Sequence, residues 1–494
     1  MRRLALALAL LLAGCPAPSE VPEPATPAPR FGRLARDVYL WLVTLNQGVQ
    51  VPLVVEGEAV APSAPIVAGR PGLLRVFLLP EEGFQRRELL AELVVETGGE
   101  VTVLRATADV REASATDDLD STLNFELPPE LLAEDTRWSL AVREVDGAPT
   151  AAPGPTWPEV DEELTWSEDV DDAYVLPRVG LGASAWGGTL RVHIVPVRHD
   201  ADGSGRLPDT SDEQLELIRA RLYALYPVRE VELTVGAEYP TSIVFDSSSD
   251  PMSDLLQEMA TLREERGIPF DTYVYGMVNP DPTYEEYCAQ GCTAGIAYRV
   301  SNPNTSRLRS GVGLGYSGER TADTLAHEVG HNHDRGHAPC GNPGNPDTAF
   351  PYPNGGIGAW GWDVGTGELK SPGEYSDVMG YCSERWISDY QFDALWRRVS
   401  AVEGLASWEG EPQAVQVVGE RSSELRPGPI WSLRALPQGE SVPVRLLDGS
   451  GSVLEVLDAV RVPIEDADTA TLLLPLLGPE VAGVELLDGR RGTL

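Results

Sequence analysis

The first third of the chain carries short apolar runs separated by Pro, Gly and acidic residues. Runs rich in Val and Leu lie at 38–43, 73–78, 101–104 and 138–142. Short apolar runs bounded by turn-forming residues are typical of β-strands, and roughly 100 residues of this pattern suit an immunoglobulin-like sandwich. We therefore expect an all-β domain of this kind over residues 37–150.

The pattern changes near residue 186, where apolar positions begin to recur at helical spacing. Between 211 and 226 they fall at every third or fourth residue, which indicates a helix with one buried face. Strands are expected at 190–197, 231–235 and 273–278, with a second helix at 252–266. This mixed order predicts an α/β (α+β) domain over residues 186–408 and suits an enzyme, although a fold alone does not establish function.

Short strands return after this domain, for example at 414–418 and 442–447. They predict a second β-sandwich over residues 409–494, acting as an accessory domain. Residues 151–185 are rich in Pro, Ala and acidic side chains, so we expect a linker there. The predicted architecture is multidomain, with the α/β domain flanked by all-β sandwiches.

The N-terminus has the order of an export signal. Two arginines precede an apolar run at 4–12, which is much shorter than the roughly 20 residues needed to span a bilayer. The small residues before Cys15 resemble the lipobox of bacterial lipoprotein signal peptides, and this implies cleavage before Cys15 and a lipid on its thiol. We expect a signal peptide over residues 1–15, a tether over 16–36, and a membrane-anchored protein in the periplasm or at the cell surface. An ordinary signal peptide with an incidental cysteine is the alternative.

Net charge narrows the expected partners. The chain has 38 Lys and Arg against 76 Asp and Glu, a formal charge of −38. Nucleic acids and anionic lipid surfaces attract dense cationic patches, so neither is expected as a partner. Membrane contact is expected through the lipid anchor alone, and the acidic surface favours a monomer.

Four further cysteines, Cys288, Cys292, Cys340 and Cys382, form an even set that predicts two disulfides in an exported protein. Three pairings are open. Cys288 with Cys292 would close a tight loop, and Cys340 with Cys382 would join two distant segments. A zinc site built from these thiols is less favoured, because their spacing lacks paired CxxC motifs.

The strongest chemical signal is the sequence His327-Glu328-Val329-Gly330-His331. On a helix, histidines four residues apart lie on one face about 6 Å apart, so both can reach one Zn²⁺. Glu328 can then act as general base on a zinc-activated water. His337 follows six residues later as a candidate third ligand, whereas His333 is expected to be exposed or to support the ligands from outside. A histidine-rich surface helix is the alternative.

The pattern His327-Glu328-x-x-His331-x-x-Asp334-x-x-His337 resembles the extended zinc signature HExxHxxGxxH of the metzincin metalloproteases. The resemblance implies one catalytic zinc, a helix that ends at the Gly position, a sharp turn, and a third ligand from a loop. Asp334 stands where Gly is usual. The turn needs a positive φ, which Asp tolerates better than most residues.

A second metzincin feature is a methionine-containing turn beneath the zinc, which Ser376-Asp377-Val378-Met379-Gly380-Tyr381 resembles. The resemblance implies that Met379 forms a floor under the imidazoles. Tyr381 matches the Met-x-Tyr arrangement of the astacin and serralysin branches, in which the phenol ligates zinc or stabilises the oxyanion. A packed core tyrosine is the alternative for Tyr381.

Within the metzincins, the segments at 358–363 and 385–390 are similar to the StcE-type mucin-degrading metalloproteases, as is the expected β-domain ahead of the catalytic one. The resemblance implies that a strand containing Gly295, Ile296 and Ala297 binds substrate as an added strand. It also implies that Arg385 and Trp386 shape the pocket beyond the cleaved bond.

The sequence therefore predicts a zinc metalloendopeptidase that acts on extracellular proteins, with glycoproteins as a candidate class. Alternatives are a surface-anchored glycan- or protein-binding lipoprotein with a vestigial zinc site, and a structural lipoprotein of the envelope. A thermolysin-like site with Glu384 as third ligand is less favoured, because its spacing is off by one and His337 would be idle. Asp200 to Gly205 resembles a calcium loop only in part, since Ser211 stands where a bidentate Glu is needed, so a polar turn is favoured there.

Overall fold

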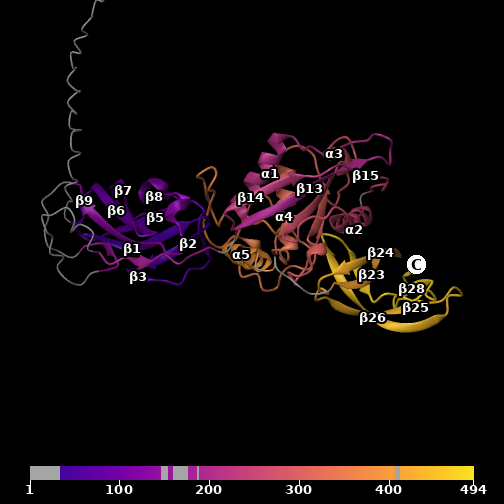
Figure 1. The fold of residues 1–494 in the computed structure, drawn as a ribbon. Coiled ribbons are helices and arrows are strands. Elements are labelled where there is room, and N and C mark those ends of the chain that lie inside the picture. Colours follow the sequence, from indigo (N-terminus) through magenta and orange to yellow (C-terminus); the bar gives the residue numbers. More distant parts are fainter. Residues whose placement is uncertain are drawn as a thin grey trace, which may run out of the picture.

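The computed structural model describes residues 34–145, 154–159, 176–185, 188–246, 248–403, 405 and 412–494. The chain is multidomain and mostly β, with mixed sheets and few helices. Figure 1 shows three parts in a row: a β-rich N-terminal part, a central part that contains the long helices, and a C-terminal β part. The predicted signal peptide, Cys15 and most of the tether lie outside the described residues. Among the described helices, none is long and apolar enough to cross a membrane.

The N-terminal part is built from two sheets that share one hydrophobic core. The first has the order β2-β1-β5-β8 and is extended beyond β2 by β19 (Gly361–Trp362) and β20 (Leu369–Lys370) of the central part, and the second has the order β10-β9-β6-β7. Alternate residues of β6, Leu89, Ala91, Leu93 and Val95, are at most 2% exposed, as expected where one face of a strand packs on a core. The strands and short 3₁₀ helices are β1 (Val38–Asn46), β2 (Gly48–Val55), β3 (Glu58–Ala59), β4 (Ile66–Val67), β5 (Gly72–Pro80), β6 (Arg87–Thr97), β7 (Glu100–Val110), η1 (Leu119–Ser121), β8 (Leu123–Leu127), η2 (Pro129–Leu131), β9 (Arg137–Glu144), β10 (Thr156–Trp157), β11 (Val179–Gly180) and β12 (Ala183–Ser184).

The segment expected to be a linker takes part in this sheet. Strands β10 and β11 both pair with β9, and Trp157 packs against Trp138 with ring centroids 6.2 Å apart. The buried ring of Trp157 stabilises these short strands. Pro and acidic residues flank it in the sequence, so no apolar run indicates the strands. The described parts of 151–185 therefore belong to the N-terminal sheet.

The central part has a sheet ordered β14-β13-β16-β18-β17, in which only β17 is antiparallel to its neighbour β18. Helices α1 and α4 pack with Tyr273, Tyr275 and Met277 on one face, whereas α2 packs with Val274 and Val278 on the other. This alternation along β16 follows from the two-residue period of a strand. The elements are β13 (Thr189–His199), α1 (Asp212–Leu225), β14 (Glu230–Val235), β15 (Tyr239–Thr241), α2 (Asp250–Glu265), β16 (Thr272–Val278), α3 (Tyr284–Tyr287), β17 (Gly295–Tyr298), η4 (Ser306–Leu308), β18 (Ser310–Leu314), α4 (Glu319–Asn332), η5 (Pro353–Gly355), β19 (Gly361–Trp362), β20 (Leu369–Lys370), β21 (Ser376–Asp377), β22 (Arg385–Trp386) and α5 (Asp389–Glu403).

The N-terminal part is joined to the central part through α1. The guanidinium of Arg70 is fully buried and donates to the carbonyl oxygens of Tyr223, Tyr226 and Val228 at 2.7, 2.8 and 2.9 Å. The last carbonyls of a helix have no partner within it, so Arg70 satisfies acceptors that would otherwise be buried unpaired. In addition, β19 from the central part pairs with β2.

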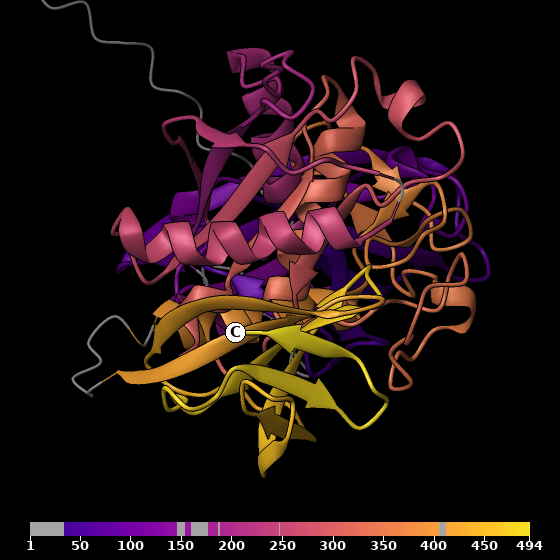
Figure 2. The same ribbon diagram turned by 90° about the vertical axis from the view of Figure 1, so that its right-hand side faces the viewer.

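The C-terminal strands continue the central sheet. Strand β26 pairs antiparallel with β17, with Ala297 opposite Glu465 and Tyr298 opposite Ile464. Helix α2 lies between the central sheet and these strands, and Figure 2 shows it directly above them. The C-terminal region is therefore fused to the central sheet along one edge, which the expectation of a separate accessory sandwich did not anticipate. Its strands are β23 (Gln413–Glu420), β24 (Leu425–Leu433), β25 (Glu440–Leu447), β26 (Val453–Glu465), β27 (Thr469–Leu474), β28 (Gly483–Leu486) and β29 (Arg491–Thr493).

Candidate metal centre

Helix α4 carries the first two histidines of the motif and ends as the signature requires. His333 caps the helix and Asp334 adopts a left-handed conformation with φ of 67°. The Asp334 N–H donates to the His331 carbonyl at 2.8 Å, and the Arg335 N–H donates to the Gly330 carbonyl at 3.1 Å. This pair of bonds is the Schellman arrangement that commonly ends helices. Asp334 thus makes the turn that glycine makes in the signature, and the chain returns to place His337 beside the helix.

The three predicted ligands are held by backbone carbonyls on their outer nitrogens. The Nδ1 atoms of His327, His331 and His337 lie 2.8, 2.8 and 2.9 Å from the carbonyl oxygens of Val378, Arg335 and Gly344. A neutral imidazole that donates from Nδ1 has a lone pair on Nε2. All three Nε2 atoms therefore point inward as acceptors, and those of His327 and His331 are 3.0 Å apart.

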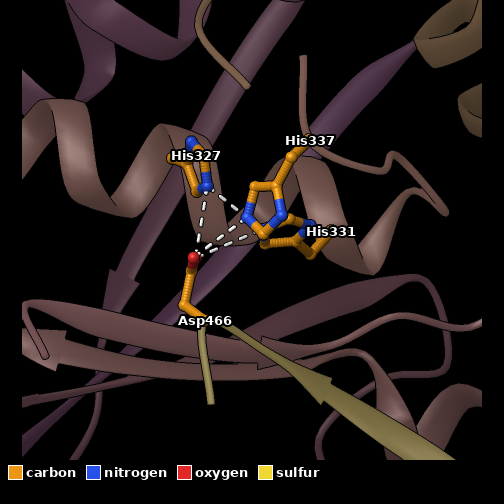
Figure 3. Close-up of side chains that lie close together, drawn as sticks. All are labelled: His327, His331, His337 and Asp466. Carbon is orange, nitrogen blue, oxygen red and sulfur yellow. Dashed lines mark hydrogen bonds and ion pairs between the residues drawn. The ribbon is translucent and has the colours of Figure 1, made fainter. Parts of the chain in front are cut away.

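A fourth group completes the cluster, and sequence reasoning missed it. Asp466 Oδ2 lies 3.2 Å from His327 Nε2 and 3.3 Å from His331 Nε2, and its Oδ1 lies 2.9 Å from His337 Nε2. Figure 3 shows Asp466 reaching the histidines from the C-terminal β part. It lies between β26 and β27, in a short acidic turn with no metal-binding motif around it, so no local signal indicates its role.

The donor set fits a tetrahedral divalent cation. The four ligand atoms lie within 4.8 Å of one another. Zinc bonds of about 2.0–2.1 Å place neighbouring ligands roughly 3.3 Å apart in a tetrahedron. The oxygens of Asp466 lie 2.9–3.3 Å from the three Nε2 atoms, and the Nε2 atoms of His327 and His331 are 3.0 Å apart. Shared protons or a cation must lie among these facing acceptors, and one divalent cation satisfies all four at once. The cluster is therefore compatible with a zinc site.

Burial and contacts within the cluster shift the pKa values of its ionisable groups. Burial opposes ionisation of Asp466, but interaction with His327, His331 and His337 outweighs this and holds its pKa well below the ordinary range. Burial lowers the pKa of His331, which favours the neutral, metal-binding imidazole.

Glu328 is buried beside the cluster, with 2% of its surface exposed. Burial raises its pKa well above the ordinary value, and the negative charge of Asp466, a side-chain hydrogen bond with Asp466 and the negative charge of Glu465 raise it further. Its Oε2 atom has no hydrogen-bond partner among the described residues. Gly295 of β17 packs against it, since a Cβ there would lie 2.7 Å from Glu328 Oε1. The predicted base thus lies between the histidines and the predicted substrate-binding strand.

The methionine-containing turn lies under α4. Met379 is 1% exposed, and a Cβ on Gly330 would lie 2.5 Å from its sulfur. The buried Asp377 carboxylate accepts hydrogen bonds from the N–H groups of Met379 and Ser388 at 2.8 and 2.9 Å, and burial raises its pKa to about 6. The packing of Met379 on Gly330 places the turn against α4, and the Asp377 bonds tie the turn to the segment before α5.

Tyr381 lies at the edge of the cluster. Its hydroxyl is 3.3 Å from His337 Nε2, and 45% of its surface is exposed. This exposure rules out the alternative of a packed core tyrosine.

Both predicted disulfides are present. Cys288 pairs with Cys292, and Cys340 pairs with Cys382. The second bridge ties the loop after His337 to the methionine-containing turn. Two disulfides are typical of an extracellular or periplasmic protein.

Two expectations are corrected by burial. His333 is 1% exposed and stacks on Tyr273 with ring centroids 4.5 Å apart, so it belongs to the core and contacts no ligand histidine; burial lowers its pKa to about 3. Trp386 is 1% exposed and its indole N–H donates to the Gly48 carbonyl at 2.7 Å. It supports the interface with the N-terminal part instead of lining a pocket, whereas the neighbouring Arg385 is partly exposed.

The remaining metal alternatives find no support among the described residues. Glu384 is exposed and lies outside the cluster. In the segment resembling a calcium loop, Asp200 pairs with Arg198 and Asp202 pairs with Arg206. Carboxylates engaged by arginines make a polar turn, as favoured from the sequence.

Comparison with known proteins finds a family match for part of the chain. Residues 288–389 match the family described as Peptidase M66, and this segment contains the three histidines, Glu328, Met379 and Tyr381. No curated protein matches the chain. Asp466 lies beyond the matched segment. The match, taken with the histidine–aspartate cluster, supports a metalloprotease family for this chain.

Proposed function

We propose that the protein is a zinc-dependent endopeptidase of metzincin type that hydrolyses peptide bonds of extracellular proteins. The observation that carries the proposal is the convergence of three imidazole Nε2 atoms beside a buried carboxylate whose Oε2 has no partner among the described residues. A binding protein with a vestigial site has no need of that carboxylate.

His327, His331 and His337 would hold the ion. Zinc bound there supplies Lewis acidity, which polarises the scissile carbonyl and makes water a nucleophile near neutral pH. Glu328 accepts a proton from the attacking water and returns it to the leaving amine.

Two further groups position the substrate. The hydroxyl of Tyr381 donates a hydrogen bond to the oxygen of the scissile carbonyl as negative charge develops there. The edge of β17 opposite β18, which β26 pairs only at Ala297 and Tyr298, binds the substrate main chain at Gly295, Ile296 and Ala297 as an added strand. Arg385, partly exposed near Asp323 at 3.6 Å, is the remaining candidate for the substrate side chain beyond the cleaved bond.

The setting of the enzyme is part of the proposal. Lipidation of Cys15 would anchor it to a membrane outside the cytoplasm, where extracellular proteins are its substrates. Glycoproteins are the first class to test, because the segments at 358–363 and 385–390 resemble those of the StcE-type enzymes.

The test is cleavage of a peptide library and a glycoprotein panel, read by mass spectrometry, with zinc content measured in the same samples. Four proteins are compared: wild type, Glu328→Gln, Asp466→Ala and the double variant that carries both substitutions. We expect one zinc per chain in all four proteins and cleavage only where Glu328 is present. Equal cleavage with and without Glu328 would refute the proposed base, and zinc-loaded chains that cleave nothing would favour the binding-protein alternative.

A further inference from the structure

The C-terminal part contributes a ligand to a site whose other groups all belong to the central part. A catalytic zinc held by three protein ligands keeps a fourth position open for water and substrate. With an ion held by the three histidines, the Asp466 carboxylate would take that position, because its oxygens lie 2.9–3.3 Å from all three Nε2 atoms.

The strand that delivers Asp466 also covers the substrate-binding edge. Strand β17 bonds to β18 along one edge, and β26 bonds along the other at Ala297 and Tyr298. The chain therefore runs antiparallel to β17 and directs its next side chain, Asp466, onto the metal position. A bound peptide would need the same strand edge and the same metal position.

We propose that the turn between β26 and β27, residues 465–468, is an internal inhibitor that keeps the enzyme latent until it is displaced. This inference rests on the endopeptidase function proposed above. It assigns a regulatory role to the C-terminal part, which the sequence pattern marked only as an accessory domain.

The turn is held by contacts of its own residues and of its neighbour Thr469. Glu465 pairs with Ala297 in the strand ladder and lies 3.8 Å from Arg299, Ala467 packs against the core formed with α2, and the hydroxyls of Thr469 and Ser253 are 2.7 Å apart. Displacing the turn requires these local contacts to break. The ion pair is partly exposed, so it contributes at most about 1 kcal/mol. Asp466 has a φ of 65°, a left-handed conformation that favours glycine over residues with side chains. The strands on either side of the turn are fixed more firmly, because Val462 and Leu473 are buried in the core formed with α2.

The retained catalytic groups argue against a purely structural metal site. A closed four-ligand site needs no general base, yet Glu328 lies buried beside it with a partnerless oxygen. It also needs no exposed phenol, yet Tyr381 lies 3.3 Å from His337 and is 45% exposed. A cleft of about 450 Å³ remains open next to the turn, and both His337 and Tyr381 line it. These features fit a blocked active site.

The experiment compares the full-length wild type with Asp466→Ala, using Asp468→Ala as the matched control. Asp468 belongs to the same turn and carries the same charge, but it is exposed and lies outside the cluster. Zinc affinity is measured by competition with a chromogenic chelator. Access to the metal is measured as the affinity of the zinc-loaded proteins for acetohydroxamate, a small ligand that needs an open position on the metal. Hydrogen exchange of the β17 amides reports whether the turn has left the strand.

We expect Asp466→Ala to retain one zinc, bound at least about tenfold more weakly because a ligand is lost. It should bind acetohydroxamate at least tenfold more tightly than wild type, and the amides of β17 should exchange faster. Asp468→Ala should match wild type in all three measurements. Equal acetohydroxamate affinity in wild type and Asp466→Ala would overturn the inference, and so would complete loss of zinc in Asp466→Ala, which would make Asp466 a permanent structural ligand.

Peptide cleavage in the same samples separates this inference from the proposed function. Faster cleavage by Asp466→Ala than by wild type supports both. If Asp466→Ala opens access to the metal but no variant cleaves peptides, the inhibitor proposal stands and the endopeptidase proposal fails. If cleavage depends on Glu328 but is equally fast in wild type and Asp466→Ala, the endopeptidase proposal stands and the inhibitor proposal fails.

Discussion

Asp334 is the one position at which the zinc signature departs from its usual residue, and its backbone allows a quantitative prediction. It adopts a φ of 67° between the helix and the third ligand, and its carboxylate accepts a hydrogen bond from Arg299 Nε at 3.3 Å. Three substitutions separate these two contributions. Asp334→Gly removes the conformational cost and the ion pair, Asp334→Asn keeps a residue that tolerates this φ but removes the charge, and Asp334→Ala loses both the tolerance and the charge.

The expected magnitudes follow from exposure and from φ. The Asp334 and Arg299 side chains are 36% and 35% exposed, so their ion pair is worth at most about 1 kcal/mol. A left-handed conformation costs an ordinary residue about 1–2 kcal/mol. Asp334→Ala should therefore lower the free energy of unfolding by about 1–3 kcal/mol, and Asp334→Asn by at most about 1 kcal/mol. For Asp334→Gly, relief of the left-handed strain is offset by about 0.4–1 kcal/mol of extra unfolded-chain entropy, which leaves a net change within about 1 kcal/mol.

The measurement is urea unfolding of the zinc-loaded proteins, together with zinc affinity, because the turn positions His337. Glu384→Gly serves as the control, since Glu384 also has a positive φ of 53° but is exposed and away from the cluster. It should be neutral or slightly stabilising and leave zinc affinity unchanged. If Asp334→Ala is as stable as Asp334→Gly and binds zinc as tightly, the conformational explanation for aspartate at this position is wrong.

Three further substitutions test the groups around the site. Gly295→Ala places a Cβ 2.7 Å from Glu328 Oε1, so it should lower kcat at least about tenfold with zinc content unchanged; an unaffected kcat would show that the carboxylate tolerates displacement. Asp377 has a pKa of about 6 in the folded protein and about 3.9 in the unfolded chain. Its contribution to the free energy of unfolding is therefore largest below pH 4, and about 3 kcal/mol of it is lost as the pH rises through 6. Asp377→Asn should remove that slope from stability measured between pH 4 and 7, and an unchanged slope would contradict the burial argument. Arg70→Ala removes the donor from three buried carbonyls that accept hydrogen bonds of 2.7–2.9 Å, and each unsatisfied carbonyl costs about 1–3 kcal/mol of stability. The substitution should therefore speed proteolysis between the N-terminal and central parts. Unchanged proteolysis would mean that β2–β19 pairing suffices to hold the two parts together.

The sequence could predict those features that depend on neighbouring residues. Two histidines four residues apart on a helix must share a face, and this held for His327 and His331. The positive φ at Asp334 was expected from the signature, because the turn is made by the residue itself and by hydrogen bonds to the preceding helical turn. The Cys340–Cys382 bridge was one of the open pairings and needed the structure to select it.

Features that depend on pairing between distant segments required the tertiary structure. His333 and Trp386 were misjudged because burial is decided by elements remote in sequence: Tyr273 of β16 covers the first, and Gly48 of the N-terminal part accepts the indole N–H of the second. The fusion of the C-terminal strands to the central sheet rests on two residue pairs between β17 and β26, and no periodicity within either strand specifies its neighbour.

By itself, then, the sequence specified the motif: a histidine pair, a predicted base, a turn and a predicted third ligand lie within eleven residues, and helix geometry sets the separation of the first two histidines. Only the tertiary structure decided how accessible that chemistry is. Asp466 lies 129 residues after His337 in an ordinary acidic turn, and it reaches the histidine cluster because β26 pairs with the edge of β17. Local conformational preferences specify the histidine motif. The contact of Asp466 with the histidines depends instead on a long-range strand pairing that those preferences do not encode.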